Sequence, residues 1–141
     1  MREVAYMLVQ LTWGLPQTLA GALVCLVMPT DERRFRFHGA VVTTWRLRKG
    51  LSLGPFVFIP PRSSRRLLVH EYGHTIQSLI LGPAYLPLMV VPSMVWAGLP
   101  ALQRRRERRG TSYYSFFTER LADRLGERVT GERSMGTDCG V

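Results

Sequence analysis

The sequence has too few cysteines to build a disulfide framework. Its 141 residues include only Cys25 and Cys139, one in an apolar stretch and the other in a polar one. Small domains that rely on disulfides carry a larger set of cysteines at regular spacings. We therefore expect two free thiols, and a fold that is held together by other interactions.

Charged residues are absent from two long stretches, Val4–Met28 and Thr75–Gln103. Each is longer than the ~20 apolar residues that a helix needs to cross the hydrocarbon core of a bilayer. The first stretch is too long for the apolar region of a signal peptide and has no convincing cleavage site. The sequence therefore predicts an integral membrane protein that retains both stretches.

Acidic residues are scarce, since 10 Asp and Glu stand against 19 Lys and Arg, for a net charge of +9. Nine of the cations lie in residues 30–66 and nine in 104–133, next to the apolar stretches. They do not alternate with aromatic residues, so we reject nucleic acid as the default partner. The positive-inside rule instead places both segments on the cytoplasmic side of a bacterial inner membrane. Anionic lipid headgroups are a sufficient partner for them.

Proline and glycine interrupt the first apolar stretch at Trp13–Pro16. Proline removes a backbone donor and kinks a helix. The stretch could therefore span the bilayer with a kink or turn back as a shallow hairpin, and the sequence does not decide between the two.

Two segments rich in β-branched and aromatic residues, Phe35–Trp45 and Ser52–Ile59, are separated by Arg48–Gly50. This pattern predicts two strands joined by a turn, which would form a small β-hairpin.

Helical segments follow the predicted hairpin. Ser63 or Ser64 offers an N-cap for a helix that ends at about Leu81, before Gly82 and Pro83. The rest of the second apolar stretch should be a membrane-embedded helical segment, and Tyr113 to about Arg128 an amphipathic helix. We therefore expect a mainly α integral membrane protein with a small β-hairpin. Residues 1–129 would form one membrane-embedded domain, and 130–141 a disordered tail.

One motif carries recognisable chemistry: His70-Glu71-Tyr72-Gly73-His74 matches H-E-x-x-H. On a helix, positions i and i+4 share a face, so both imidazoles can reach one metal ion. In such sites the glutamate acts as the general base on metal-bound water. The plainer alternative is that both histidines lie on a helix surface and pair with local carboxylates.

A catalytic zinc ion usually has three protein ligands. Glu119 is the first candidate for the third, and Asp123, four residues later, could accept the free N–H of a ligand imidazole. His38 is a weaker candidate because it lies in a predicted strand. Alternatively, Glu119 and Asp123 form a solvated pair beside Arg120 and Arg124.

Four other polar residues are candidates for a pocket around the metal. Tyr72, Tyr113 and Tyr114 could donate a hydrogen bond to a developing oxyanion, although anchoring at a membrane interface is the commoner role of such tyrosines. Gln77 could line the pocket or satisfy helix–helix contacts.

The metal hypothesis constrains the topology of the second apolar stretch. If Glu119 meets the two histidines, the chain must leave one membrane face and return to it, because a full crossing would separate the ligands by ~30 Å. A break near Gly82-Pro83 or Pro87 would allow this return.

The H-E-Y-G-H motif with a downstream Glu119-x-x-x-Asp123 resembles the gluzincin arrangement of zinc metallopeptidases. That resemblance implies a Zn²⁺ ion held by His70, His74 and Glu119. It also implies that Glu71 is the catalytic base and that Asp123 orients a histidine.

A longer stretch, from Trp13 to Gly126, resembles a group of small bacterial membrane proteins. It covers about four fifths of the chain. The pieces that carry the resemblance are W-G-L-P-Q-T-L, S-L-G-P-F-V-F, H-E-Y-G-H-T-I-Q-S, L-G-P-A-Y-L-P and T-E-R-L-A-D-R-L-G. The resemblance implies a unit of helix, β-hairpin and zincin-like helix, without naming a substrate.

Together these features predict a membrane-bound zinc-dependent hydrolase. The expected activity is that of a metallopeptidase that cleaves a peptide or membrane protein at the cytoplasmic membrane face. The alternative is a non-catalytic membrane module, with or without metal, that assembles with a partner protein. Glu71 discriminates between them, because a structural zinc site needs the two histidines but not the glutamate.

Overall fold

The chain folds into helices packed around a four-stranded sheet. The computed structural model describes residues 2–28 and 30–138, and six α-helices and four β-strands lie within these ranges. The helices are α1 (Arg2–Thr12), α2 (Leu15–Val27), α3 (Arg65–Leu81), α4 (Val91–Gly98), α5 (Pro100–Arg109) and α6 (Phe117–Thr130). The strands are β1 (Thr30–Phe37), β2 (Ala40–Trp45), β3 (Leu51–Leu53) and β4 (Phe56–Ile59).

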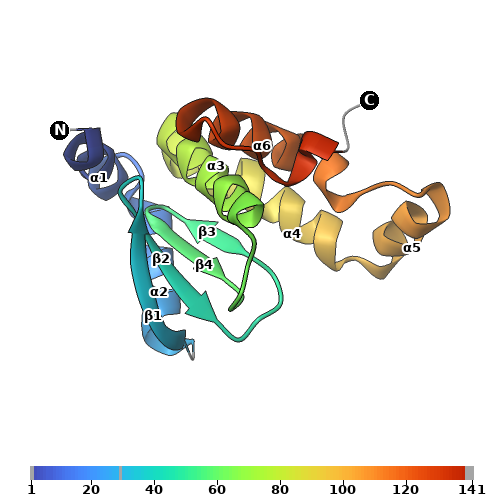
Figure 1. The fold of residues 1–141 in the computed structure, drawn as a ribbon, viewed down its shortest axis with the longest axis horizontal. Coiled ribbons are helices and arrows are strands. Elements are labelled where there is room, and N and C mark those ends of the chain that lie inside the picture. Colours follow the sequence, from blue (N-terminus) through green and yellow to red (C-terminus); the bar gives the residue numbers. More distant parts are fainter. Residues whose placement is uncertain (1, 29, 139–141) are drawn as a thin grey trace.

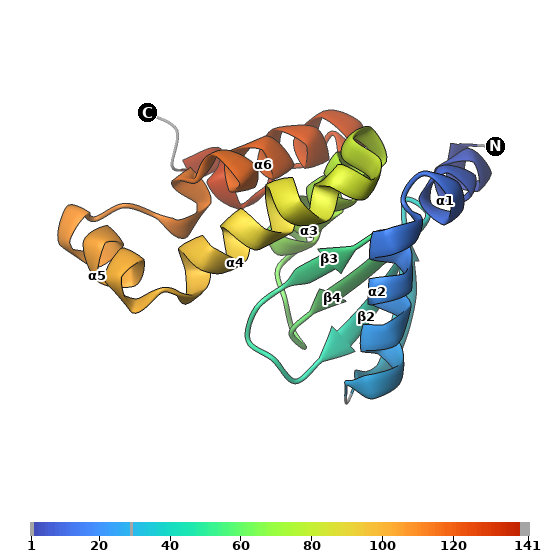
Figure 2. The same ribbon diagram turned by 180° about the vertical axis from the view of Figure 1, so that it is seen from behind.

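The elements form layers, with the sheet between α2 and α3 and with α6 beside α3 (Figures 1 and 2). Between α3 and α4 lie a 3-10 turn, Gly82–Ala84, and a short π-helical turn, Leu86–Val90. α5 lies at the opposite end of the molecule from α1 (Figure 1). The main apolar core fills the space between α3 and the sheet and comprises Tyr6, Phe37, Ala40, Val42, Val57, Ile59, Leu68, Val69 and Tyr72.

The prediction of a mainly α integral membrane protein is wrong, because the fold is mixed α and β. None of the helices in the described ranges is, by itself, long and apolar enough to cross a membrane. Two pairs of consecutive helical segments are together long and apolar enough, but each pair is bent where its two segments join. The bend is 94° between α1 and α2, and 73° between Leu86–Gly98 and α5. The apolar stretches are divided because glycine and proline interrupt them, first at Trp13–Pro16 and again from Gly82 onward.

The prediction of one small β-hairpin is also wrong, since the strands form a mixed sheet in the order β1-β2-β4-β3. β1–β2 and β3–β4 are antiparallel, whereas β2 and β4 run parallel. His38 and Gly39 split the first predicted strand with positive φ angles of 47° and 91°, as a two-residue type I′ hairpin turn requires. Gly54 and Pro55 split the second, and there only Gly54 has a positive φ, of 59°. Arg48–Gly50 belongs to the connection from β2 to β3.

The helix predicted to contain the motif is confirmed as α3. Ser64 caps it, because its side chain accepts a hydrogen bond from the backbone N–H of Leu67 at 3.2 Å. It ends at Leu81, where Gly82 adopts a positive φ of 53°. The predicted final helix begins later than expected, at Phe117, after a short 3-10 turn over Tyr113–Ser115.

Residues 131–136, which we expected in a disordered tail, make specific contacts instead. Arg65 of α3 forms an ion pair with Glu132, with Nε 2.7 Å from Oε2. Ser134 is fully buried, and its backbone N–H donates to Glu127 at 2.9 Å. This segment therefore packs on α3 and α6. Cys139, at the end of the expected tail, lies outside the described residues.

α1 and α2 show an inverted polarity, with amide side chains inside and leucines outside. Gln10 and Gln17 are fully buried, whereas Leu19, Leu23 and Leu26 are 60%, 61% and 85% exposed. The Gln10 amide donates to the Thr75 carbonyl at 3.1 Å, and the Gln17 amide donates to the Ser78 hydroxyl at 2.9 Å. Buried polar groups thus join these helices to α3, and the leucines form the outer surface of α2.

α3 and α6 approach closely because each contributes a glycine to the contact. A Cβ atom at Gly73 of α3 would collide with the carbonyl oxygen of Ala122, and one at Gly126 of α6 would collide with that of Val69. The two backbones therefore touch directly, which brings the side chains on the facing surfaces within reach of one another.

We expect Gly73→Ala to lower the free energy of unfolding by about 1–3 kcal/mol, because the added methyl group must push α6 away from α3. The higher helix propensity of alanine would offset up to ~1 kcal/mol of this cost. Gly98→Ala is the matched control, since Gly98 is also helical and a Cβ there meets nothing within 4 Å. Denaturant-induced unfolding measures both. Equal stability of the two variants would contradict the close-contact interpretation.

Candidate metal centre

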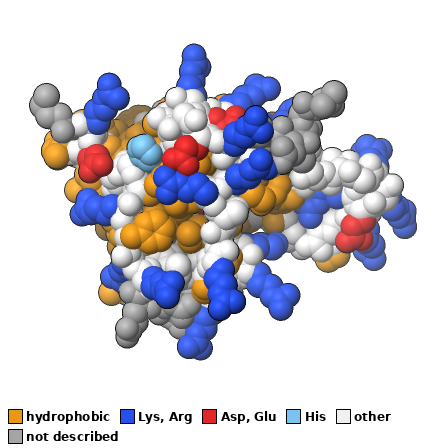
Figure 3. Space-filling view, viewed as in Figure 1, with side chains coloured by type: hydrophobic (Ala, Val, Ile, Leu, Met, Phe, Trp, Pro, Cys, Tyr) orange, Lys and Arg blue, Asp and Glu red, His pale blue; other side chains and the backbone are white. Residues whose placement is uncertain are grey.

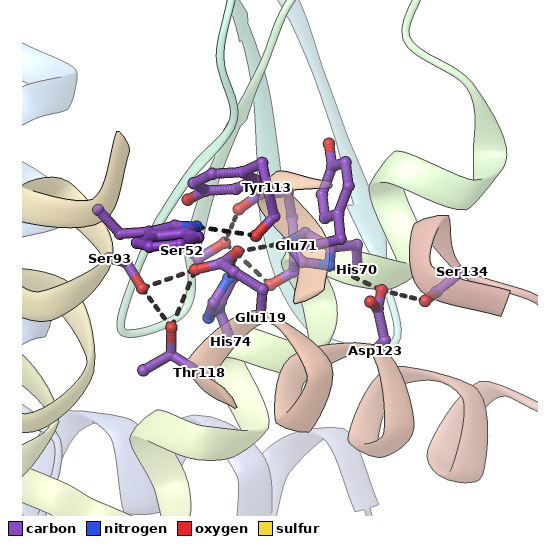
Figure 4. Close-up of polar contacts among 12 residues, drawn as sticks. Ser52, His70, Glu71, His74, Ser93, Tyr113, Thr118, Glu119, Asp123 and Ser134 are labelled. Carbon is purple, nitrogen blue, oxygen red and sulfur yellow. Dashed lines mark hydrogen bonds and ion pairs between the residues drawn. The ribbon is translucent and has the colours of Figure 1, made fainter. Parts of the chain in front are cut away.

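Two histidines of α3 and a glutamate of α6 converge on one point (Figure 4). Nε2 of His70 lies 3.1 Å, and Nε2 of His74 3.3 Å, from Oε2 of Glu119. All three residues are buried, and one ligand atom from each lies within 4.8 Å of the others. The group could therefore hold a metal ion, and to this extent the metal prediction is confirmed.

Gln77 determines which nitrogen of the His74 ring carries the proton in the neutral form. Its side-chain NH₂ donates to the carbonyl oxygen of Thr118 at 2.8 Å, so its Oε1 must face His74, 2.7 Å from Nδ1. Since Oε1 can only accept, Nδ1 carries a proton. The neutral ring then has its lone pair on Nε2, which points toward Glu119.

Asp123 does the same for His70. Its Oδ1 lies 2.8 Å from Nδ1 of His70 and also accepts a hydrogen bond from the hydroxyl of Ser134. Nδ1–H donates a hydrogen bond to this carboxylate, which leaves the lone pair on Nε2 as the ligand atom. An aspartate that orients an imidazole in this way is a frequent neighbour of metal sites.

The second oxygen of Glu119 is held by hydroxyl groups. Ser93 of α4 donates to Oε1 at 2.6 Å and Thr118 at 3.1 Å. With Oε1 engaged, Oε2 is the oxygen left for the imidazoles. Sequence reasoning missed Ser93, Thr118 and Ser134. Of these only Thr118, adjacent to Glu119, could have been suspected from its position.

The electrostatics of the three groups favour a bound cation. Burial alone would raise the pKa of Glu119, but hydrogen bonds with His70 and His74 outweigh it and hold that pKa well below its usual range. Burial likewise opposes the charged form of His70, yet Asp123 and Glu119 raise the pKa of His70 to about 10. The pKa of His74 is also raised, chiefly by Glu119 acting against burial. Protons therefore hold the group together without a metal, and a divalent cation can replace them.

The three candidate ligands lie in the wall of a cavity of about 390 Å³, which Glu71 also lines. The Glu71 carboxylate is buried, and the Ser52 hydroxyl of β3 donates to its Oε2 at 2.7 Å. Gly50 lies so close that a Cβ atom there would collide with this carboxylate. The segment that leads into β3 therefore positions Glu71 beside the metal group.

The tyrosines divide between the cavity and the core. Tyr113 and Tyr114 line the cavity, and the Tyr114 ring meets His70 edge-on at 4.9 Å. Burial raises the pKa of Tyr114 to about 12 and that of Tyr113 further, so both phenols keep their protons. Tyr72 instead packs in the core against Phe37, and its hydroxyl donates to the carbonyl of His38 at 3.1 Å.

The remaining sequence candidates lie apart from the cavity. Gln77 contacts Nδ1 of His74, on the other side of the ring from the candidate ligand atom Nε2, and it does not line the cavity. The His38 ring packs on Phe37 and Tyr72 and is not part of the metal group. The imidazoles that converge are therefore those of the motif.

Comparisons with protein-family models, with curated proteins and with solved structures found no match.

Metal binding should release protons, because the pKa of His70 is raised to about 10 without metal. At about pH 7 a divalent ion must displace that proton, so apparent affinity should fall as the pH is lowered. Calorimetric Zn²⁺ titrations in buffers of different protonation enthalpy should show release of about one proton or more. Binding that is equally tight at lower pH and releases no proton would contradict this assignment of the ligands.

Proposed function

We propose that the chain is a zinc-dependent hydrolase of the metallopeptidase type, with His70, His74 and Glu119 as the metal ligands. Two imidazole nitrogens and one carboxylate oxygen form a ligand set typical of catalytic zinc, which keeps a fourth position open. The observation that carries the proposal is their convergence in the wall of a cavity that Glu71 also lines.

Zinc in such a site acts as a Lewis acid and lowers the pKa of a coordinated water to about 7. Glu71 would accept the proton from the attacking water. Ser52 holds one of its oxygens, and the other makes no hydrogen bond within the described part of the chain. The carboxylate is therefore oriented and still able to accept.

Tyr113 and Tyr114 would serve as hydrogen-bond donors to the oxyanion that develops when a peptide carbonyl is attacked. Both line the cavity, and both phenols are protonated at neutral pH, since burial raises pKa values that ordinarily already lie near 10. Gln77 and Asp123 would keep the lone pairs of the two histidines on Nε2.

Glu71→Gln should keep zinc and lose hydrolysis, because the amide cannot accept the proton. Loss of a general base costs about 10²- to 10⁴-fold in rate. His74→Ala should lose zinc itself. Metal content of the purified protein and cleavage of a peptide library measure the two effects separately. A Glu71→Gln protein with zinc and full activity would contradict the role of Glu71 as general base. A wild-type protein that binds zinc but cleaves no peptide would favour a non-catalytic module that assembles with a partner.

We also propose that the hydrolase works at a membrane surface, with the cytoplasmic face of a bacterial inner membrane as its place. Support comes from the inverted polarity of α1 and α2, where glutamines are buried and leucines exposed. Covering such a surface with lipid lowers the free energy by about 25 cal/mol per Å² of apolar area removed from water. The exposed arginines of α5, which are Arg104, Arg105, Arg108 and Arg109, would then meet anionic headgroups.

Replacing both Leu19 and Leu23 by Ser should weaken binding to vesicles that contain anionic lipid by at least about tenfold, because two outward leucines lose their apolar contact. Leu47→Ser is the control, since Leu47 is also exposed but lies between β2 and β3. Vesicle flotation measures the bound fraction. A wild-type protein that stays wholly in the aqueous fraction would contradict the membrane proposal.

A further inference from the structure

Arg106 lies in the wall of the metal cavity, whereas the other arginines of α5 are exposed. Two aromatic rings flank it, with Cζ 5.0 Å from the Trp96 ring centroid and 5.5 Å from that of Tyr113. One guanidinium nitrogen donates to the Trp96 carbonyl at 3.0 Å. The side chain is therefore held in place. It presents a planar cation with five N–H groups, and only one of its nitrogens donates a hydrogen bond to residues 2–28 and 30–138.

A series of contacts connects Arg106 to the metal centre. The Trp96 indole N–H donates to the Tyr113 carbonyl at 3.1 Å. The Tyr113 and Tyr114 rings meet edge-on, with their centroids 5.3 Å apart. The centroid of the Tyr114 ring lies in turn 4.9 Å from that of His70. Arg106 thus occupies a defined position relative to the proposed ligands.

Within the described part of the chain, the charge of Arg106 is not balanced by an acidic partner. No carboxylate among residues 2–28 and 30–138 lies within ion-pair distance of it. The two carboxylates of the cavity are engaged elsewhere, Glu119 by the histidines and Glu71 by Ser52. Arg48 and Lys49 line the same cavity. The cavity therefore offers positive charge to whatever enters it.

We propose that Arg106 forms an anion subsite for a carboxylate of the substrate, while the bond to be cleaved lies at the metal centre. A guanidinium between aromatic walls suits a planar carboxylate, which it can bind through two parallel hydrogen bonds. The carboxylate is the C-terminus of a peptide or an acidic side chain near the cleaved bond. This inference rests on the proposed hydrolase function and specifies its substrate class.

Binding of small hydroxamates tests the subsite without requiring catalysis. The zinc-loaded Glu71→Gln protein is titrated with the monohydroxamates of succinic, glutaric and adipic acid, each compared with its ω-amide. In at least one pair the free acid should bind about 10- to 100-fold more tightly than the amide, the range expected for a hydrogen bond to a charged group. Adding Arg106→Gln should abolish this advantage. Arg106→Lys should keep only part of it, because an ammonium ion lacks the planar fork.

Arg105→Gln is the matched control, since Arg105 is on the same helix but exposed and outside the cavity. It should leave the advantage of the free acid unchanged, and zinc content verifies that each variant has folded. Equal binding of acid and amide in every pair would overturn the subsite and leave the zinc hydrolase intact. If zinc is bound but no hydroxamate binds, the proposed function fails and the subsite with it.

Peptides distinguish the two carboxylate sources in the active protein. One pair differs only in a free or amidated C-terminus, and another only in Asp or Asn beside the cleaved bond. Within each pair, kcat/KM of the peptide with the carboxylate is divided by kcat/KM of its neutral partner. The pair for which this ratio falls to about one in Arg106→Gln identifies the carboxylate that is bound. Cleavage of all four peptides at the same rate would contradict the inference.

Discussion

The structure depends on one buried carboxylate that lies between two helices. Glu119 of α6 places a single oxygen within 3.3 Å of both imidazoles of α3. This is possible only because the helices touch through glycine, at Gly73 on one side and Gly126 on the other. Burying these charges is costly unless each is paired and hydrogen-bonded. The surrounding amide, carboxylate and hydroxyl groups meet that requirement, and they leave the three ligand atoms directed at one point.

Polar groups also support α3 from the opposite side. Gln10 and Gln17, carried by the N-terminal helices, reach backbone and side-chain groups of α3 near Thr75 and Ser78. The motif helix is therefore held by hydrogen bonds along two faces and by apolar packing on the sheet. Such a framework limits the movement of the histidines relative to Glu119. Because Gln17 faces α3, the leucines on the opposite side of α2 face outward. The helix that supports the site therefore also provides an exposed apolar surface.

Much of the local structure could be predicted from the sequence, but the path of the chain could not. The cap at Ser64 and the end near Gly82 follow from local backbone requirements, and both were visible in the residues. The strands were misjudged because runs of β-branched and aromatic residues hid the turn at His38-Gly39. The apolar stretches were misjudged because length and lack of charge indicate a membrane span equally well when a bend divides the helix.

The sequence by itself determined that His70 and His74 share a face of one helix, because the period of a helix is a local property. It also singled out Glu119 and Asp123, since their own spacing places them together. Only the tertiary structure decided that these two helices touch, that Ser93 and Gln77 orient the ligands, and that Arg106 faces the same cavity. Those relations join residues that are far apart in the chain, and they arise from packing that no local pattern encodes.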